Sequence, residues 1–497
     1  MLLMLLRRSC PMLMVTTPTR NQVSLDISAD TLYIRDNFYY TKMLKAPLWS
    51  LHFIRMFMRS FRIVLSACLL LSQAKPATAQ YGPIKKWAEE ELLTSAPLKQ
   101  AHTGISIYEP ATGKYWYNYQ EDHYFTPASN TKIFTLYTGL RLLGDSLPAL
   151  RYLLTDSALY VKGMADPAFL HPDYKVQPAW QLLQQTSQPI RLVPAVIENK
   201  RFGSGWAWSD YADYYQPELN EWPVYGNVAR VRHHGDSTVI WPRMFSDTLH
   251  FSVHRNDKLE ELLTERDERS NRFSVTYNGN DKSVQEGEIP FITGGNDDLV
   301  YRLQDTLHKQ ISIVAGGNQP AQTSFSLLRG IPVDTLFQPM MHRSDNFFAE
   351  QTLMMCSALL WDTISTARTI AFMQKSYLAN LPDTPKWVDG SGLSRYNLFT
   401  PRDFVSVLSD MYKTYPSQRL YALFPTGGKG TLKNYYKQQF VHAKTGTLSG
   451  CVALSGYLVT KKNKTLVFSV LVNNHNNSAT AVRRTVESFL TQIWEKY

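Results

Sequence analysis

The sequence predicts an α+β fold in which one antiparallel sheet packs against helices and is interrupted by a β-rich insertion. Three observations predict it. A hairpin followed by a helix lies near the start of the body of the chain, and a second hairpin followed by a helix ends it. The stretch between them has a different, β-rich texture. The two hairpins can pair into one sheet, so the chain between them is partly an insertion.

The elements before the insertion are predicted from apolar spacing. Residues 84–98 have the pattern of a helix, and residues 103–120 that of a hairpin around the turn-forming run 109–114. A second helix is expected to begin near Ser129. Its apolar positions, three or four residues apart, are Ile133, Phe134, Leu136, Tyr137 and Leu140.

The end of the chain repeats this order. Residues 452–459 and 465–472 predict two strands around the polar turn 460–464. Ser478 is the expected N-cap of a final helix. The apolar stripe of that helix is Val482, Val486, Phe489, Leu490, Ile493 and Trp494.

Residues 156–314 are predicted to form one or two inserted β-rich domains. Short β-like runs alternate there with turns rich in Asp, Asn and Gly. Aromatic residues crowd residues 206–225. Binding of a glycan is one use for them, but we interpret them as packing and loop-anchoring residues.

Composition excludes several classes of protein. The chain has 497 residues, 44% apolar and 19% charged, which excludes a wholly disordered or collagen-like chain. Four cysteines are too few for a disulfide scaffold. Residues 1–79 hold ten Lys and Arg against three Asp and Glu, so most of the net charge of +10 lies there. The body has no polybasic stretch, which argues against nucleic-acid binding.

Residues 58–79 have the three parts of a secretory signal: a positive start, an apolar run over residues 63–71 too short to span a bilayer, and the cleavage site Ala77-Thr78-Ala79. We therefore expect an exported protein. Residues 1–57 fit no targeting pattern and are interpreted as an extension upstream of a true start at Met56 or Met58.

Two further points concern cysteine. Residues 65–68 resemble a lipoprotein acylation box, but the apolar run continues after Cys68, so a lipid anchor is the less favoured reading. After cleavage only Cys356 and Cys451 remain. They are predicted to be two buried thiols, with a disulfide left open as the alternative.

Three short motifs carry the chemistry: Ser129-Asn130-Thr131-Lys132, then Ser344-Asp345-Asn346, then Lys444-Thr445-Gly446. Each is weak alone, and a chance Ser-x-x-Lys occurs at residues 72–75. Taken singly they could be a helix cap, a helix start and a solvated edge charge. The set of three, in this order, indicates a serine hydrolase that uses lysine.

Helical spacing places Ser129 and Lys132 one turn apart on one face, within hydrogen-bond reach. A serine hydroxyl is a weak nucleophile until a base takes its proton, and lysine is a base only when neutral. Lowering a lysine pKa from ~10.4 to near 7 needs about 4 to 5 kcal/mol. Burial and a second cation such as Lys444 both act in that direction.

The remaining motif residues have predicted roles in binding and proton transfer. The backbone N–H groups of Ser129 and Thr447 are expected to form an oxyanion hole. Ser344 would carry a proton to the leaving amine, and Asn346 would hold a substrate amide. Lys444 and Thr445 offer a cation and a hydroxyl for a terminal carboxylate.

At these motifs the chain resembles the penicillin-recognising serine D-Ala-D-Ala peptidases and is most similar to the low-molecular-mass class C penicillin-binding proteins. The segments that carry the resemblance are residues 127–132, 163–167, 344–350, 389–395 and 428–432. The resemblance implies that Ser129 is acylated, Lys132 is the general base, Ser344 transfers a proton and Lys444 binds substrate.

The resemblance also implies the architecture and the activity. The transpeptidase-like domain would be an antiparallel sheet with helices on both faces, formed by residues 81–155 and 315–497 and interrupted by residues 156–314. We expect a periplasmic serine-type D-alanyl-D-alanine carboxypeptidase that acts on peptidoglycan stem peptides and reacts with β-lactams. No cofactor, metal or nucleic acid is implied, and at most a peripheral membrane association. Endopeptidase activity and the oligomeric state are left open.

Rival signatures are weaker. Gly144-Asp145-Ser146-Leu147, residues 294–297 and residues 305–308 imitate the blocks of GDSL-type esterases, but their context is wrong and they are interpreted as turn residues. No His-Glu-x-x-His is present, and His233 and His234 would point to opposite faces of a strand. A β-lactamase or esterase using the same serine, or a binding module without turnover, remains open, because no residue pattern sets the deacylation rate.

Overall fold

The computed structural model describes residues 24–28, 31–36, 39–42, 82–314, 316 and 319–497. The chain divides into two compact units, Met1–Ala77 and Thr78–Tyr497. The first unit contains an antiparallel sheet of β1 (Ser24–Ser28), β2 (Thr31–Asp36) and β3 (Tyr39–Lys42). The predicted signal segment 58–79 and the acylation box lie outside the described residues. Among those described, no helix combines the length and apolar character needed to cross a membrane.

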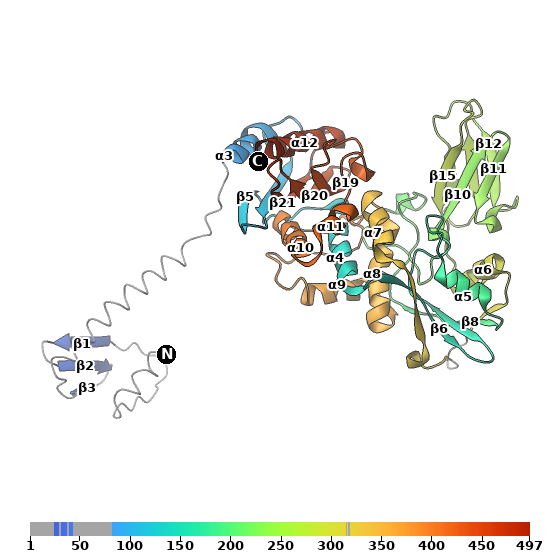
Figure 1. The fold of residues 1–497 in the computed structure, drawn as a ribbon, viewed down its shortest axis with the longest axis horizontal. Helices are drawn as coiled ribbons and strands as arrows, with labels where there is room; N and C mark the ends of the chain where they lie inside the picture. Colours follow the sequence, from blue (N-terminus) through green and yellow to red (C-terminus); the bar gives the residue numbers. More distant parts are fainter. Residues whose placement is uncertain (1–23, 29–30, 37–38, 43–81, 315, 317–318) are drawn as a thin grey trace. The chain divides into compact units, whose positions relative to one another are not determined.

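A five-stranded antiparallel sheet lies among helices in the part of the second unit that contains its two ends (Figure 1). Its strands, in spatial order, are β19 (Val441–Leu448), β20 (Cys451–Val459), β21 (Thr465–Asn473), β4 (His102–Glu109) and β5 (Lys114–Tyr119). Strand β21 pairs with β4, with Val470 opposite Ile105. The prediction that the two terminal hairpins share one sheet is therefore confirmed.

One face of this sheet is covered by α12 (Ala479–Lys496), α3 (Gly82–Lys86) and the π-helix η1 (Trp87–Leu92). Ser478 caps α12 as predicted, accepting a hydrogen bond from the N–H of Ala481. The predicted helix over residues 84–98 is wrong at its end, because regular helix stops at Leu92. The hydroxyls of Thr94 and Ser95 turn back to preceding carbonyls, and Pro97 has no N–H to continue a helix.

The other face packs against a larger group of helices, so helices cover both faces as expected. These elements are η2 (Ala128–Thr131), α4 (Lys132–Leu142), α7 (Val333–His342), α8 (Asn346–Trp361), α9 (Thr366–Lys375), α10 (Pro401–Thr414) and α11 (Ser417–Leu423). The short η7 (Gly430–Leu432) packs on the α12 side, where Leu432 is part of the core. Every residue of α8 from Asn346 to Ala358 is buried. Phe134 of α4 packs against Phe399 with their ring centroids 4.5 Å apart.

The chain between α4 and α7 forms further cores (Figure 1). A mixed sheet runs in the order β16 (Ile311–Ile313), β8 (Ile190–Leu192), β7 (Leu159–Gly163), β6 (Ser146–Leu154) and β17 (Ser326–Pro332). It packs with helices α5 (Pro178–Gln185) and α6 (Gly295–Leu307). The two-residue strands β9 (Val196–Ile197) and β18 (Thr363–Ile364) pair in parallel.

Two three-stranded sheets share a separate core that includes Phe245, Phe273 and Phe291. One sheet contains β11 (Ser237–Trp241), β10 (Val228–His234) and β15 (Gln285–Pro290), and the other β12 (Phe251–Arg255), β14 (Phe273–Tyr277) and β13 (Leu263–Arg266). The short 3-10 helices of this part of the chain are η3 (Trp208–Asp210), η4 (Tyr225–Asn227), η5 (Arg243–Phe245) and η6 (Gln322–Ser324).

Strands β6 and β17 pair with each other on either side of the predicted insertion, residues 156–314. The hydrogen-bonded sheet of the insertion thus continues beyond both of those limits. The predicted domain boundaries themselves stay predictions.

Several smaller expectations can be compared directly with the structure. Residues 294–297 and 305–308 were predicted to be turn residues, which is wrong: they lie at the start and end of a single helix, α6. The turn prediction is also wrong for Ser146 and Leu147, which follow a helix and begin β6. His233 is buried and His234 is exposed, on opposite faces of β10 as predicted. Cys356 and Cys451 are both free and buried, which confirms that reading.

Candidate active site

A cavity of about 810 Å³ lies between the helices around α4 and the inserted segment. Ser129, Ser344, Asn346 and Thr447 all line it, so residues of the first two motifs and the residue that follows the third meet at one cavity. The insertion contributes another wall, which includes His171, Trp206, Tyr214, Tyr215 and Arg230. Part of the aromatic cluster that we had assigned to packing therefore faces the cavity.

Ser129 lies in the 3-10 turn η2, directly before α4, rather than in the α-helix itself. This turn is tightly enclosed. A Cβ atom on Gly392 would lie 1.9 Å from the carbonyl oxygen of Ala128, and one on Gly446 would lie 2.5 Å from that of Pro127. Two glycines from distant parts of the chain therefore allow the backbone to close around the serine.

Lys132 is fully buried and its Nζ donates hydrogen bonds to three oxygens. These are Ser129 Oγ at 3.0 Å, Asn346 Oδ1 at 2.6 Å and the carbonyl oxygen of Ser391 at 2.7 Å. The amide and carbonyl oxygens can only accept. In a neutral lysine the two N–H bonds would satisfy those two oxygens, and the lone pair would face the hydroxyl of Ser129.

Burial lowers the pKa of Lys132 from 10.5 to about 8. The negative charges of Asp389, Glu350 and Asp345 act in the opposite direction. Desolvation of the ammonium group is thus the main cause of the shift. Lys444 was expected to lower this pKa. The repulsion between the two cations is seen at Lys444, whose pKa the charge of Lys132 helps to lower.

Asn346 uses both ends of its side chain inside the protein. Its Oδ1 accepts from Lys132, and its Nδ2 donates to the carbonyl oxygen of Tyr215 at 3.0 Å. The first residues of α8 are ordered by Asp345, whose side chain caps the helix. The predicted substrate-binding amide is therefore already engaged, holding the lysine and the insertion together.

Ser344 and Lys444 form the second hydroxyl–amine pair. Lys444 Nζ donates to Ser344 Oγ at 2.8 Å and to the carbonyl oxygen of Thr445 at 2.7 Å. Lys444 is fully buried and does not line the cavity, so it contacts Ser344 from inside the protein. Burial, followed by the charges of Lys132 and Arg483, lowers its pKa well below the ordinary value. Ser344 has a φ of +63°, a strained conformation for a residue other than glycine.

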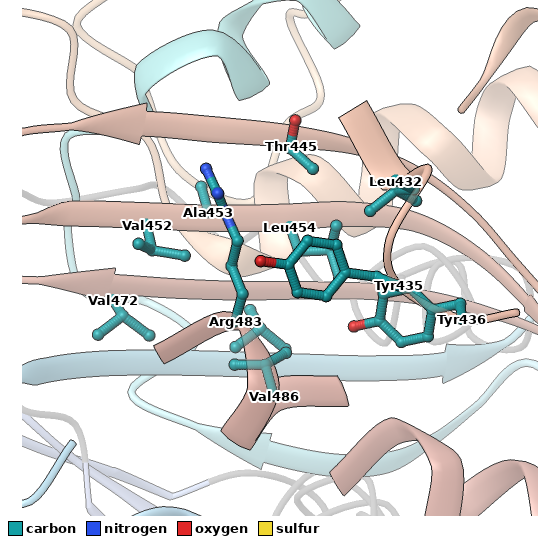
Figure 2. Close-up of a pocket in the computed structure, with 11 residues that line it drawn as sticks. Leu432, Tyr435, Tyr436, Thr445, Val452, Ala453, Leu454, Val472, Arg483 and Val486 are labelled. Atoms are coloured by element: carbon teal, nitrogen blue, oxygen red, sulfur yellow. The ribbon is translucent and has the colours of Figure 1, made fainter. Parts of the chain in front are cut away.

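Thr445 and Thr447 alternate with Lys444 along β19, so their side chains lie on the other face of the strand. The hydroxyl of Thr445 donates to Thr431 Oγ1 at 2.8 Å. Figure 2 shows Thr445 beside a smaller cavity between the sheet and α12. Thr447 lines the large cavity with Ser129, and the oxyanion hole from their two N–H groups stays a prediction.

Two buried carboxylates beside the site had no role assigned from the sequence. Glu350 accepts hydrogen bonds from the N–H groups of Gly390 and Ser391 at 3.1 and 2.7 Å. Burial, followed by the charge of Asp389, raises its pKa to about 8. Helical spacing could have found it, because Glu350 lies one turn after Asn346 on α8.

The side chain of Asp389 orders the loop that comes directly after Gly390 and Ser391, the two residues whose N–H groups donate to Glu350. It accepts hydrogen bonds from Gly392 N at 2.8 Å, Ser394 N at 2.7 Å, Asn397 Nδ2 at 2.7 Å and Trp206 Nε1 at 2.9 Å. These contacts fix the loop whose Ser391 carbonyl receives a hydrogen bond from Lys132. Glu350 and Asp389 thus order the loop that Lys132 contacts, and neither lines the large cavity.

Comparisons with known proteins agree on one family. The model of the D-Ala-D-Ala carboxypeptidase 3 (S13) family matches residues 88–493. The chain is 22% identical over 435 residues to penicillin-sensitive carboxypeptidase A of Dictyostelium discoideum, covering 74% of this chain and 82% of that protein. It is 23% identical over 456 residues to the D-alanyl-D-alanine carboxypeptidase of Actinomadura sp. (strain R39), covering 78% and 81%.

The fold is similar to that of a solved structure, penicillin binding protein 4 (dacB) from Haemophilus influenzae. The TM-score is 0.63 at 19% identity, over 83% of this chain and 98% of that one. At this level of identity the likeness establishes the shared fold.

Proposed function

Because the chain belongs to the D-Ala-D-Ala carboxypeptidase 3 (S13) family, we propose that it is a serine-type D-alanyl-D-alanine carboxypeptidase that cleaves the terminal peptide bond of peptidoglycan stem peptides. The observation that carries the proposal is the contact of Lys132 Nζ with Ser129 Oγ at 3.0 Å, made from a fully buried lysine. A buried amine beside a hydroxyl at a large cavity is the arrangement that serine activation by lysine requires.

Acylation begins when neutral Lys132 takes the proton of Ser129 and Oγ attacks the carbonyl carbon of the penultimate D-Ala. The carbonyl oxygen then carries negative charge and accepts hydrogen bonds from the N–H groups of Ser129 and Thr447. At pH 7 roughly a tenth of the Lys132 side chains are neutral, given a pKa of about 8.

Collapse of the tetrahedral intermediate breaks the C–N bond, and the leaving amine of D-Ala needs a proton. Ser344 donates it, and the adjacent Lys444, 2.8 Å away, stabilises the oxygen that has lost it. The proton that Lys132 took from Ser129 then passes to Ser344, so Ser344 is a hydroxyl and Lys132 a neutral amine again. In deacylation Lys132 takes a proton from the water molecule that attacks the ester and gives it to Ser129 Oγ as the C–O bond breaks. The products are the shortened peptide and Ser129 with its hydroxyl restored.

The partners follow from this chemistry. A β-lactam presents a strained amide to the same hydroxyl, so penicillins are expected to acylate Ser129. We place the enzyme in the periplasm, after removal of residues up to Ala79, where its peptidoglycan substrate lies.

The test is labelling with a fluorescent penicillin together with release of D-alanine from a stem pentapeptide. Wild type should be labelled and should release D-alanine steadily, and Ser129→Ala should do neither. Ser146→Ala is the matched control, because Ser146 begins β6 outside the cavity, and it should keep both activities. Folded wild type that stays unlabelled would contradict the proposal.

Two other outcomes separate the alternatives. Stoichiometric labelling without D-alanine release would favour a binding module, and rapid penicillin hydrolysis without peptide cleavage would favour a β-lactamase. Mass spectrometry of digested muropeptides reports whether the terminal bond or a cross-link is cut.

A further inference from the structure

Glu350 is a buried carboxylate beside the active site, and no role was assigned to it from the sequence. It lies on α8, one helical turn after Asn346, and the residue is 2% exposed. Its hydrogen-bond donors are backbone N–H groups rather than a cation. A carboxylate that is removed from water without a paired cation lowers the stability of a fold, so its presence here requires a physical reason.

The two oxygens of Glu350 accept hydrogen bonds from two successive peptide N–H groups. Oε2 accepts from Gly390 N at 3.1 Å, and Oε1 accepts from Ser391 N at 2.7 Å. This segment lies directly on α8, since a Cβ atom on Gly390 would be 2.8 Å from the carbonyl oxygen of Ala349. The absence of a side chain at Gly390 therefore lets the backbone come close enough for the carboxylate to accept both hydrogen bonds.

The carbonyl groups of the same two residues contact α4. The carbonyl oxygen of Gly390 accepts from Thr135 Oγ1 at 2.6 Å, and that of Ser391 accepts from Lys132 Nζ at 2.7 Å. The segment thus bridges two helices, because α8 accepts from its N–H groups and α4 donates to its carbonyl groups. Through this bridge, Glu350 fixes the orientation of the carbonyl that faces Lys132.

That carbonyl determines which side of the lysine amine faces the serine. Of the three oxygens around Lys132 Nζ, the Ser391 carbonyl and Asn346 Oδ1 have no hydrogen to donate. When both are in place, they use the two N–H bonds of a neutral lysine, and the lone pair points to Ser129. Without the carbonyl, an N–H bond would turn toward Ser129, and the amine would donate to the hydroxyl that it must deprotonate.

Glu350 also acts on Lys132 through its charge. The carboxylates that face the lysine are Asp389 of the loop, Glu350 of α8 and Asp345 at the start of α8, and all three oppose the lowering of its pKa by burial. The cation that faces it is Lys444 of β19. Burial and the charge of Asp389 raise the pKa of Glu350 to about 8, which is also the pKa of Lys132. The two groups therefore ionise in the same pH range, and each affects the other.

We propose that Glu350 is a positioning residue for Lys132. It holds the loop so that the Ser391 carbonyl faces Nζ, and its charge opposes loss of the ammonium proton. The proposal rests on the proposed acyl-enzyme chemistry and concerns a residue that does not line the cavity. Its consequence is an acylation rate that rises with pH more gradually than a single titrating group allows.

The experiment measures the rate constant of acylation by a chromogenic penicillin at pH values on both sides of 8, with circular dichroism to confirm the fold. Glu350→Gln removes the charge, so the pH of half-maximal rate should fall by about one unit and the rise should follow a single group. Its plateau should be several-fold lower, because the amide NH2 faces an N–H group that needs an acceptor. Glu350→Asp keeps the charge on a shorter side chain, so its plateau should be lower while the pH of half-maximal rate stays that of wild type.

Asp403→Asn is the matched control, since Asp403 is also a buried carboxylate but lies on α10 outside the cavity. It should leave the pH of half-maximal rate unchanged. An unchanged pH in Glu350→Gln would overturn the role of the charge, and a wild-type plateau in Glu350→Asp would overturn the role of the hydrogen bonds. If Glu350→Gln does not fold, Glu350→Asp decides: a lower plateau at unchanged pH supports the proposal, and a shifted pH contradicts it.

Failure of the proposed function would give a different result. Wild type that is not acylated at any pH would overturn that function and this proposal with it. Normal acylation of wild type, with the same pH profile in both Glu350 variants, would overturn this proposal alone.

Discussion

Trp206 of the inserted segment donates its indole N–H to Asp389 Oδ2 at 2.9 Å, across 183 residues of sequence. Asp389 in turn accepts from the backbone of the loop that contains Ser391, and the carbonyl of Ser391 receives a hydrogen bond from Lys132. The insertion therefore supports the position of Lys132, the proposed base, through two intervening residues.

Trp206→Phe should weaken this support, because the buried carboxylate loses a donor that phenylalanine cannot replace. We expect a loss of about 2 kcal/mol in the free energy of unfolding, measured by urea denaturation, and acylation by penicillin several-fold slower than in wild type. Trp208→Phe is the control, since Trp208 is 56% exposed. Equal behaviour of the two variants would show that the hydrogen bond has no such role.

The rate of acylation should depend on pH through Lys132. The base works only when it is neutral, and burial lowers its pKa to about 8. The rate should therefore rise with pH and reach half of its plateau near pH 8, measured with a chromogenic penicillin while circular dichroism confirms that the fold is unchanged. A rate constant that stays flat from pH 6.5 to 9 would rule out Lys132 as the titrating base.

At position 344 the side chain that the proposed reaction needs is expected to lower the stability of the fold. Its φ of +63° is strained for any residue with a Cβ atom. Ser344→Gly and Ser344→Ala both remove the hydroxyl, so both should release D-alanine much more slowly than wild type. Glycine relieves the strain, and Ser344→Gly should be about 1 kcal/mol more stable than Ser344→Ala in denaturant titrations. The reverse order of stability would disprove this account.

Gly392→Ala should disturb the site in two ways. The added methyl group would clash with a neighbouring atom, and alanine disfavours the positive φ of this position. Its added methyl group would lie 1.9 Å from the carbonyl oxygen of Ala128, next to Ser129. Gly428 has a similar positive φ but no atom within 4 Å of its would-be Cβ, so Gly428→Ala isolates the conformational cost. Gly392→Ala should be about 2 to 3 kcal/mol less stable than Gly428→Ala and should lose penicillin labelling. Similar stability and labelling of the two variants would contradict the contact argument.

The sequence predicts well what depends on neighbouring residues. The two hairpins, the cap at Ser478 and the spacing of Ser129 and Lys132 are local patterns, and each has its counterpart in the structure. Local patterns were misleading where helix and turn signals compete, as at α6, which begins and ends with the residues that were read as turns.

Contacts between distant parts of the chain were beyond such patterns. Asn346 accepts from Lys132 across 214 residues, which makes it a support for that lysine as well as a member of the second motif. The 3-10 turn at Ser129 depends on the absence of a side chain at Gly392, far along the chain. Arg483 has no motif of its own, and only the packing of α12 against the sheet brings it to Thr447.

The pairing of β6 with β17 determines where the chain can gain or lose residues. Strand β6 directly follows α4, and β17 directly precedes α7. Because these two strands pair, the chain leaves the helices and returns to them at adjacent positions. Residues added or deleted far from β6 and β17 would leave the separation of Ser129 and Ser344 unchanged. Chains of this family can thus differ in length there while the two hydroxyl groups keep their distance.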